Sequence, residues 1–186
     1  MQPFGRLLSV IDKGGMSVNT ESLRNARALN DSVDEILNRY ASMVYRLAFA
    51  RTKNRFDADD ILQEAFMRYI RSTPDCQDEE HRKAWLIRTT INCSKTMLSS
   101  AWFRKTAPLD DTLFSEMKEH SEVYYAVLAL PVQYRTVIHL FYYEEYAVAD
   151  IAKLLDCKQS TVKSRLHRAR NLLREKLKGE TFDVQG

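Results

Sequence analysis

Glycine and proline are scarce in this sequence, with five and four among 186 residues. Both residue types interrupt regular structure, so their scarcity favours long helices over a turn-rich β fold. A run of about 18 apolar residues is also missing, which argues against a membrane span, and the N-terminus lacks the apolar core of a secretory signal. We therefore expect an all-α, cytoplasmic protein that does not insert into a membrane by itself.

Cysteine is scarce as well. Cys76, Cys93 and Cys157 are odd in number and widely spaced, and none belongs to a Cys-x-x-Cys pair or lies near a matching pair of histidines. This pattern predicts reduced thiols and no metal site. The four histidines stand in unrelated contexts, and no glycine-rich phosphate loop is present. The sequence therefore disfavours an enzyme, such as a nuclease or a helical hydrolase, and predicts no cofactor.

The net charge of +3 says little about partners, but its distribution says more. Residues 158–178 hold eight Lys or Arg side chains against one acid, Glu175. Residues 105–122 hold five acids against Lys105 and Lys118. Such asymmetry predicts a nucleic-acid surface at the C-terminal end, preceded by an acidic linker.

Hydrophobic periodicity divides the chain into two small helical domains. Residues 1–30 show no clear period and are interpreted as a flexible tail, in which Met16, after Gly14-Gly15, is a candidate natural start. The domains span 31–105 and 121–178, joined by the linker 106–120, and 179–186 form a second tail. Apolar residues at helical spacing predict a first buried stripe, at Val33, Ile36, Leu37, Tyr40, Met43, Val44 and Leu47.

Two more helices are expected in the first domain, over 57–71 and 80–102. Pro74 follows the earlier one, because proline cannot continue the hydrogen-bond ladder. Its inner face is predicted at Leu62, Phe66 and Tyr69, flanked by Ile61, Ala65 and Ile70.

The C-terminal segment has the order of a helix-turn-helix. A short helix over 149–155 precedes a turn at 156–158 and a long helix from about Gln159. Val162, Leu166, Ala169 and Leu173 share one face of that helix. Asp156 stands where glycine is common, and it tolerates left-handed backbone better than most residues. A face of short polar and basic groups can enter the major groove, and it comprises Ser160, Thr161, Ser164, His167, Arg168 and Asn171, with Lys163 and Arg165 on its flanks. A basic, solvated helix in a bundle is the alternative interpretation.

The C-terminal motif resembles the fourth region of the ECF-type sigma factors, the small alternative specificity subunits of bacterial RNA polymerase. The resemblance is carried by Leu130-Pro131-x-x-Tyr134-Arg135-x-Val137-Ile138, Asp150-Ile151-Ala152 and the run from Ser160 to Arg170. It implies binding of the minus-thirty-five promoter element through Ser160, Thr161, Lys163, Ser164, Arg165, His167 and Arg168.

A two-component response regulator would also carry such a helix-turn-helix, but the N-terminal half argues against one. The run from Asp57 to Phe66 resembles the second region of the same family, which docks on a coiled coil of the polymerase β′ subunit. With Leu62 and Phe66 inward, the outer face offers acceptors to basic partners. The resemblance assigns core binding to Asp59, Asp60, Gln63, Glu64 and Met67; a plain solvated acidic face is the alternative.

The segment from Arg82 to Leu98 resembles the part of the second region that melts and captures the minus-ten element. Single-stranded DNA calls for cations along its backbone and a flat surface for an unstacked base. The resemblance assigns this role to Trp85, Arg88, Asn92, Lys95 and Thr96, with further charge and aromatic area from Arg82, Lys83, Arg104, Lys105 and Trp102. Trp85 also suits a core position. The resemblance further implies that Asn92 holds the flipped base in a pocket closed by the loop 72–80.

Two departures and the linker complete the resemblance. Many relatives have Asp at the position of Thr96 and Arg at those of Ser99 and Ser100, so the minus-ten sequence that this chain prefers is open. The acidic linker suits mimicry of phosphate charge near the polymerase active centre, or simple solvation. The implied partners are core polymerase through its β′ and β subunits, promoter DNA, and an inhibitory anti-sigma factor. A stand-alone repressor or activator is the competing hypothesis, which predicts tight, specific DNA binding without polymerase.

Overall fold

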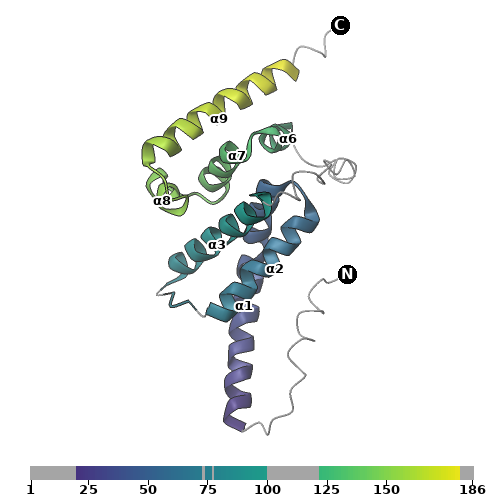
Figure 1. The fold of residues 1–186 in the computed structure, drawn as a ribbon, viewed down its shortest axis with the longest axis vertical. Helices are drawn as coiled ribbons and strands as arrows, with labels where there is room; N and C mark the ends of the chain where they lie inside the picture. Colours follow the sequence, from purple (N-terminus) through teal and green to yellow (C-terminus); the bar gives the residue numbers. More distant parts are fainter. Residues whose placement is uncertain (1–19, 73, 77, 100–121, 181–186) are drawn as a thin grey trace. The chain divides into compact units, whose positions relative to one another are not determined.

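The computed structural model describes residues 20–72, 74–76, 78–99 and 122–180, and every regular element in those ranges is a helix. The all-α prediction is thereby confirmed (Figure 1). The chain divides into two units, Met1–Leu37 and Asn38–Gly186, and the contacts described below belong to the second. The predicted linker and C-terminal tail, apart from residues 179–180, lie outside the described residues. No helix in the described part is long and apolar enough to cross a membrane.

The first helix, α1, spans Thr20–Thr52. It begins earlier than the sequence predicted, because residues 20–30 belong to the helix instead of the tail. Leucine, alanine and arginine each occur twice there, and these residues favour helix even without a clear apolar stripe. The predicted stripe is confirmed farther along, where Tyr40, Met43, Val44 and Leu47 are buried. Lys53 then takes a left-handed conformation (φ 59°), which ends the helix.

Side-chain caps start the next two helices. Helix α2 spans Arg55–Ser72, and the Asp57 amide donates to Asn54 Oδ1 at 3.2 Å. Helix α3 spans Glu79–Ser99, and the His81 amide donates to Asp78 Oδ1 at 2.8 Å. The two helices pack against each other.

The buried face of α2 differs from the prediction. Ile61 and Ala65, expected on the flanks, are fully buried together with Phe66, whereas Leu62 and Tyr69 are only half-buried. A small residue at 58 explains the shift: Ala58 is completely buried, so the row Ala58-Ile61-Ala65 allows close helix packing. Compared with the prediction, the buried face of α2 is therefore turned toward Ala58, Ile61 and Ala65. The turn is smaller than the roughly 100° that separates neighbouring residues of a helix, because Phe66 belongs to both faces.

The C-terminal helices are α6 (Glu122–Ala129), α7 (Val132–Ile138), the π-helix η3 (His139–Tyr143), α8 (Val148–Leu154) and α9 (Gln159–Glu180). Pro131 directly precedes the first residue of α7. Helix α9 contacts α6, α7 and α8. Each of these elements contributes buried apolar side chains, among them Val127, Val137, Leu140, Ile151, Val162, Leu166 and Ala169.

Candidate nucleic-acid interface

The helix-turn-helix predicted from the sequence is present. Helix α8 ends at Leu154, and the Cys157 amide donates to the Ala152 carbonyl at 3.0 Å across the turn. Asp156 has φ 50°, so it occupies the left-handed position for which its side chain is suited. Helix α9 starts at Gln159, as predicted, which orients it as the second helix of the motif.

The buried stripe of α9 leaves the predicted polar face in solvent. Val162, Leu166 and Ala169 are buried, and Leu173 is half-buried. Thr161, Arg165 and Asn171 are half-buried. The remaining predicted residues are exposed: Ser160, Lys163, Ser164, His167 and Arg168. The structure thus brings the predicted DNA-contact residues to one side of one helix.

Four of those side chains line an open hollow of about 440 Å³: Lys163, Ser164, His167 and Arg168. His167 Nε2 lies 3.2 Å from the Asn171 side-chain nitrogen, which ties the imidazole to the same face. Within the described ranges, Lys163 and Arg168 have no carboxylate partner. Two unpaired cations beside a hydroxyl and an imidazole suit a polyanion such as a DNA backbone, with donors left for base edges.

Arg170 has a different role from its basic neighbours. Its Nε donates to Tyr142 Oη at 3.0 Å, and its guanidinium carbon lies 5.6 Å from the Phe141 ring centre. This residue therefore attaches α9 to η3 and is not available as a freely placed cation.

The residues predicted to bind the minus-ten element lie on α3. Arg88, Asn92, Lys95 and Thr96 are exposed, at spacings of three and four that place them on one helix face. The Thr96 hydroxyl donates to the backbone carbonyl of Asn92 at 3.1 Å. The side-chain amide of Asn92 takes no part in this hydrogen bond. Trp102, Arg104 and Lys105 lie outside the described residues.

Trp85 is set apart from that exposed face. It is half-buried, and its ring meets Tyr69 edge-on at 5.5 Å between ring centres. Arg82 Nε donates to Tyr69 Oη at 3.0 Å, so the aromatic pair joins α2 to α3. Trp85 thus has the core contacts that the sequence also allowed.

The residues predicted to bind core polymerase lie on α2. Asp59, Asp60 and Gln63 are exposed, Glu64 and Met67 are half-buried, and Glu64 pairs with Arg68 at 2.7 Å. Burial, with the charge of Asp60, raises the pKa of the neighbouring Asp57 carboxyl. The helix therefore presents an acidic surface with an apolar edge at Met67.

Sequence reasoning missed a set of buried polar residues that join α1 and α3 to the C-terminal helices. Arg51, Arg135, His139 and Glu144 are each at most 7% exposed.

The carboxylate of Glu144 lies 3.3 Å from Lys83 Nζ and 3.7 Å from Arg46 Nη2. It also lies 3.5 Å from His139 Nε2. Burial by itself raises the pKa of the Glu144 carboxyl, but contact with His139 and Lys83 outweighs burial and leaves this pKa lowered. For two of these residues, Arg135 and His139, the sequence held a weak signal, because each is a polar residue within the mostly apolar run 130–141.

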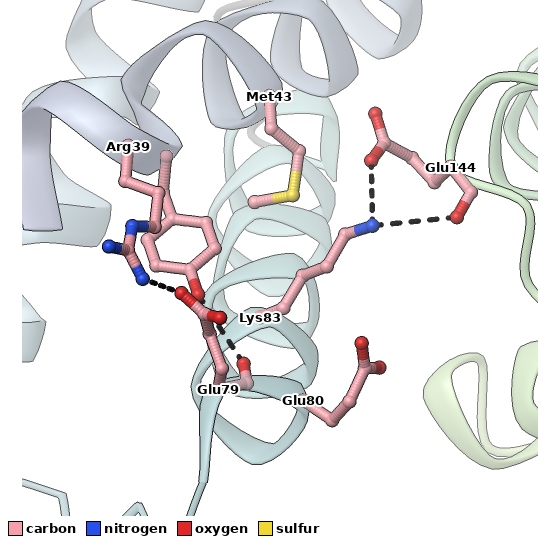
Figure 2. A pocket seen from close by; sticks show the side chains of 7 residues that line it. Arg39, Met43, Glu79, Glu80, Lys83 and Glu144 are labelled. Atoms are coloured by element: carbon pink, nitrogen blue, oxygen red, sulfur yellow. Dashed lines mark hydrogen bonds and ion pairs between the residues drawn. The ribbon is translucent and has the colours of Figure 1, made fainter.

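A cavity of about 330 Å³ adjoins this cluster (Figure 2). It is lined by Arg39, Tyr40, Met43, Glu79, Glu80, Lys83 and Glu144. Arg39 pairs with Glu79, and Tyr40 Oη donates to the Glu79 carbonyl at 3.4 Å. The charged groups of this cavity are largely paired with one another, since Arg39 pairs with Glu79 and Lys83 pairs with Glu144.

Comparison with known proteins agrees with this geometry. The model of sigma-70 region 2 matches residues 36–104, and that of sigma-70 region 4 matches residues 120–173. SigV, an RNA polymerase sigma factor of Bacillus subtilis, is 31% identical over 143 residues, which cover 73% of this chain and 85% of SigV. The chain belongs to the ECF family of RNA polymerase sigma factors.

Two further comparisons extend this result. The ECF sigma factor SigM of Mycobacterium tuberculosis H37Rv is 30% identical to this sigma factor over 142 residues, covering 74% of this chain and 72% of SigM. The sigma factor RpoE of Bartonella quintana, solved in complex with the anti-sigma factor NepR, has a similar fold with a TM-score of 0.60 at 22% identity. That likeness covers 78% of this chain and 96% of RpoE.

Proposed function

We propose that this sigma factor binds core RNA polymerase, recognises the minus-thirty-five element through α9 and the minus-ten element through α3, and promotes melting of promoter DNA. The observation that carries the proposal is the exposed face of α9, where Lys163 and Arg168 have no carboxylate partner in the described residues and lie beside Ser164 and His167. Membership of the ECF family supports the assignment.

The two DNA surfaces divide the work by chemistry. The α9 face offers cations and hydroxyl groups on a helix narrow enough for the major groove of duplex DNA. The α3 face offers Arg88 and Lys95 for phosphates and the Asn92 amide for paired hydrogen bonds to a base edge. An exposed helix face suits an unpaired strand, because its bases can turn toward the protein.

The acidic surface of α2 is the proposed docking site for the β′ coiled coil, through Asp59, Asp60, Gln63, Glu64 and Met67. Hydrogen-bond acceptors around a small apolar edge favour a basic partner, and the opposite charges of the two surfaces speed their association. An anti-sigma factor is a further proposed partner, supported by the complex in which the similar RpoE was solved. We propose that the protein acts in the cytoplasm and has no catalytic activity of its own.

The decisive experiment is promoter-dependent transcription with purified core polymerase, with and without this protein, on a library of genomic fragments. We expect new transcripts only when both are present. Absence of stimulation on every fragment would refute the proposal. Tight, specific binding to duplex DNA without polymerase would instead indicate a stand-alone repressor or activator.

A further inference from the structure

Phe56, the second residue of α2, carries an aromatic side chain that is 73% exposed. Among the described residues it is the most exposed of the large apolar side chains. A single apolar residue on a protein surface needs no special explanation. Phe56 is not isolated, however, because it continues the row of side chains that we propose to bind core polymerase.

Helical spacing places Phe56 on the same face as three members of that surface. Asp60, Gln63 and Met67 follow it at intervals of four, three and four residues, so all four side chains share one side of α2. The buried row of α2 lies on the opposite side of the helix. The acceptors Asp60 and Gln63 therefore lie between two apolar side chains, the ring of Phe56 and the thioether of Met67.

Hydrogen bonds in the turn between α1 and α2 fix the backbone that carries Phe56. The Lys53 amide donates to the Phe49 carbonyl at 2.8 Å, which closes the end of α1. The Asp57 amide donates to Asn54 Oδ1 at 3.2 Å, which caps the start of α2. A side chain on a fixed backbone loses less conformational freedom on binding than one on a mobile loop. The position of Phe56 therefore suits an anchor in an interface.

The charges around Phe56 indicate the chemistry of the partner. Asp59 and Asp60 are exposed, and neither has a cationic partner among the described residues. A partner that covers this face must supply cations for both carboxylates and an apolar surface for the ring. Aromatic residues are enriched in the interfaces of proteins, and a partner's cation near the ring would also be attracted to its π face.

We propose that Phe56 is an apolar anchor for core polymerase, and that its ring enters an apolar hollow in the same basic surface that binds Asp59 and Asp60. This inference rests on the proposed function, since it adds a residue to the proposed docking site on α2. The carboxylates and the ring contribute to binding in different ways. Exposed charges speed association and are screened by salt. Burial of the ring slows dissociation and does not depend on opposite charges.

The test measures association and dissociation rates of purified core polymerase with the full-length chain, at low and at high salt. Phe56→Ala should weaken binding by about tenfold under both conditions, chiefly through faster dissociation. Phe56→Leu keeps an apolar side chain and should retain most of the affinity. Asp60→Asn should weaken binding at low salt and have little effect at high salt.

Val123→Ala is the matched control, because it shortens another exposed apolar side chain on a different helix, α6. Its binding to core polymerase should equal that of the wild type. Circular dichroism and urea unfolding check that each variant keeps its helices and its stability. Phe56→Ala should pass this check, since the ring that it removes is exposed.

Wild-type affinity in Phe56→Ala would overturn the proposal, and so would a loss of binding that high salt abolishes or that Val123→Ala reproduces. Dimers of the wild type in analytical ultracentrifugation that Phe56→Ala abolishes would assign the ring to a second copy of this chain, and would also overturn it. The wild-type protein separates this failure from failure of the proposed function. If the wild type binds core polymerase and stimulates transcription while Phe56→Ala does so equally well, only the anchor is refuted. If the wild type does neither, the proposed function is refuted together with the anchor.

Discussion

At the residue scale, local contacts divide the basic side chains of α9 into two kinds. Lys163 and Arg168 are exposed and line the same hollow. Arg170 is held against Phe141 and Tyr142. The sequence predicted the first group because Arg168 lies on the polar face opposite the apolar stripe and Lys163 lies on the flank of that face, and it left Arg170 outside the predicted site. Only the structure supplies the reason, since the aromatic partners lie 28 and more positions away.

Replacing Arg168 with alanine tests the proposed reading of the minus-thirty-five element. Because the side chain is exposed and is a candidate for contact with a base edge, Arg168→Ala should weaken promoter binding by the holoenzyme by about 1–3 kcal/mol and relax the preference at one base pair. The measurement is an electrophoretic mobility-shift titration on a promoter and on single-base variants of it. Arg174→Ala, an exposed arginine farther along α9, is the matched control and should change binding much less. Wild-type affinity and preference in Arg168→Ala would contradict the assignment.

The cysteines differ in accessibility, which bears on redox chemistry. Cys93 packs in an apolar cluster with Ala58 and Ile61, and burial raises the pKa of its thiol. The reactive thiolate is therefore disfavoured at neutral pH. Cys157 is half-buried in the turn of the helix-turn-helix. Iodoacetamide at neutral pH should modify Cys157 well before Cys93, as followed by peptide mass spectrometry, and both should react after unfolding in guanidinium. Equal rates in the native protein would show that Cys93 is accessible.

At the element scale, the sequence predicted helix types and order well and their inner faces less well. The predicted ends of the two helices in the helix-turn-helix (HTH) agree with the structure within a residue. A clear turn precedes the helix that carries the stripe Val162-Leu166-Ala169. The inner face of α2 was misplaced, because Leu62 and Tyr69 are larger than Ala58 and Ala65. Periodicity weights size, whereas close helix packing favours small residues.

The left-handed residue in the HTH turn gives a stability prediction. Asp156 has φ 50°, a conformation that costs a β-branched residue more than it costs aspartate or glycine. Asp156→Ile should lower the free energy of unfolding by about 1–2 kcal/mol, while Asp156→Gly should leave it within about 1 kcal/mol. Urea unfolding followed by circular dichroism measures both.

Lys158→Ile is the control for that series. Lys158 is exposed close by in the same turn, but its φ is not positive, so it has no left-handed conformation to lose. A loss in Lys158→Ile equal to that in Asp156→Ile would assign the effect to the exposed isoleucine instead of the backbone.

At the scale of the whole molecule, the sequence indicated two DNA surfaces but not the contacts between α1, α3 and the C-terminal helices. Arg51 and Arg135 lie at positions where helical periodicity expects either solvent or an apolar side chain. Their acceptors are mostly backbone carbonyls, which every residue carries and no sequence pattern distinguishes. Local spacing therefore could not reveal that the guanidinium groups are buried, since their contacts join segments 43 to 85 positions apart.

Altering one of the two proposed DNA surfaces should impair the activity of that surface and leave the activity of the other intact. Asn92 is exposed on α3, and its backbone carbonyl, not its side chain, accepts the bond from Thr96. Asn92→Ala therefore removes a base-edge contact without disturbing the helix, and it should reduce strand opening while duplex binding through α9 persists. Potassium permanganate reactivity of unpaired thymines reports opening, and a mobility shift of the holoenzyme on the same promoter reports binding. Asn38→Ala, the same substitution at an exposed position of α1, should leave both signals unchanged. Permanganate reactivity in Asn92→Ala equal to that of the wild type would exclude Asn92 from the melting step. Loss of duplex binding together with strand opening in this variant would show that the α3 and α9 surfaces do not act separately.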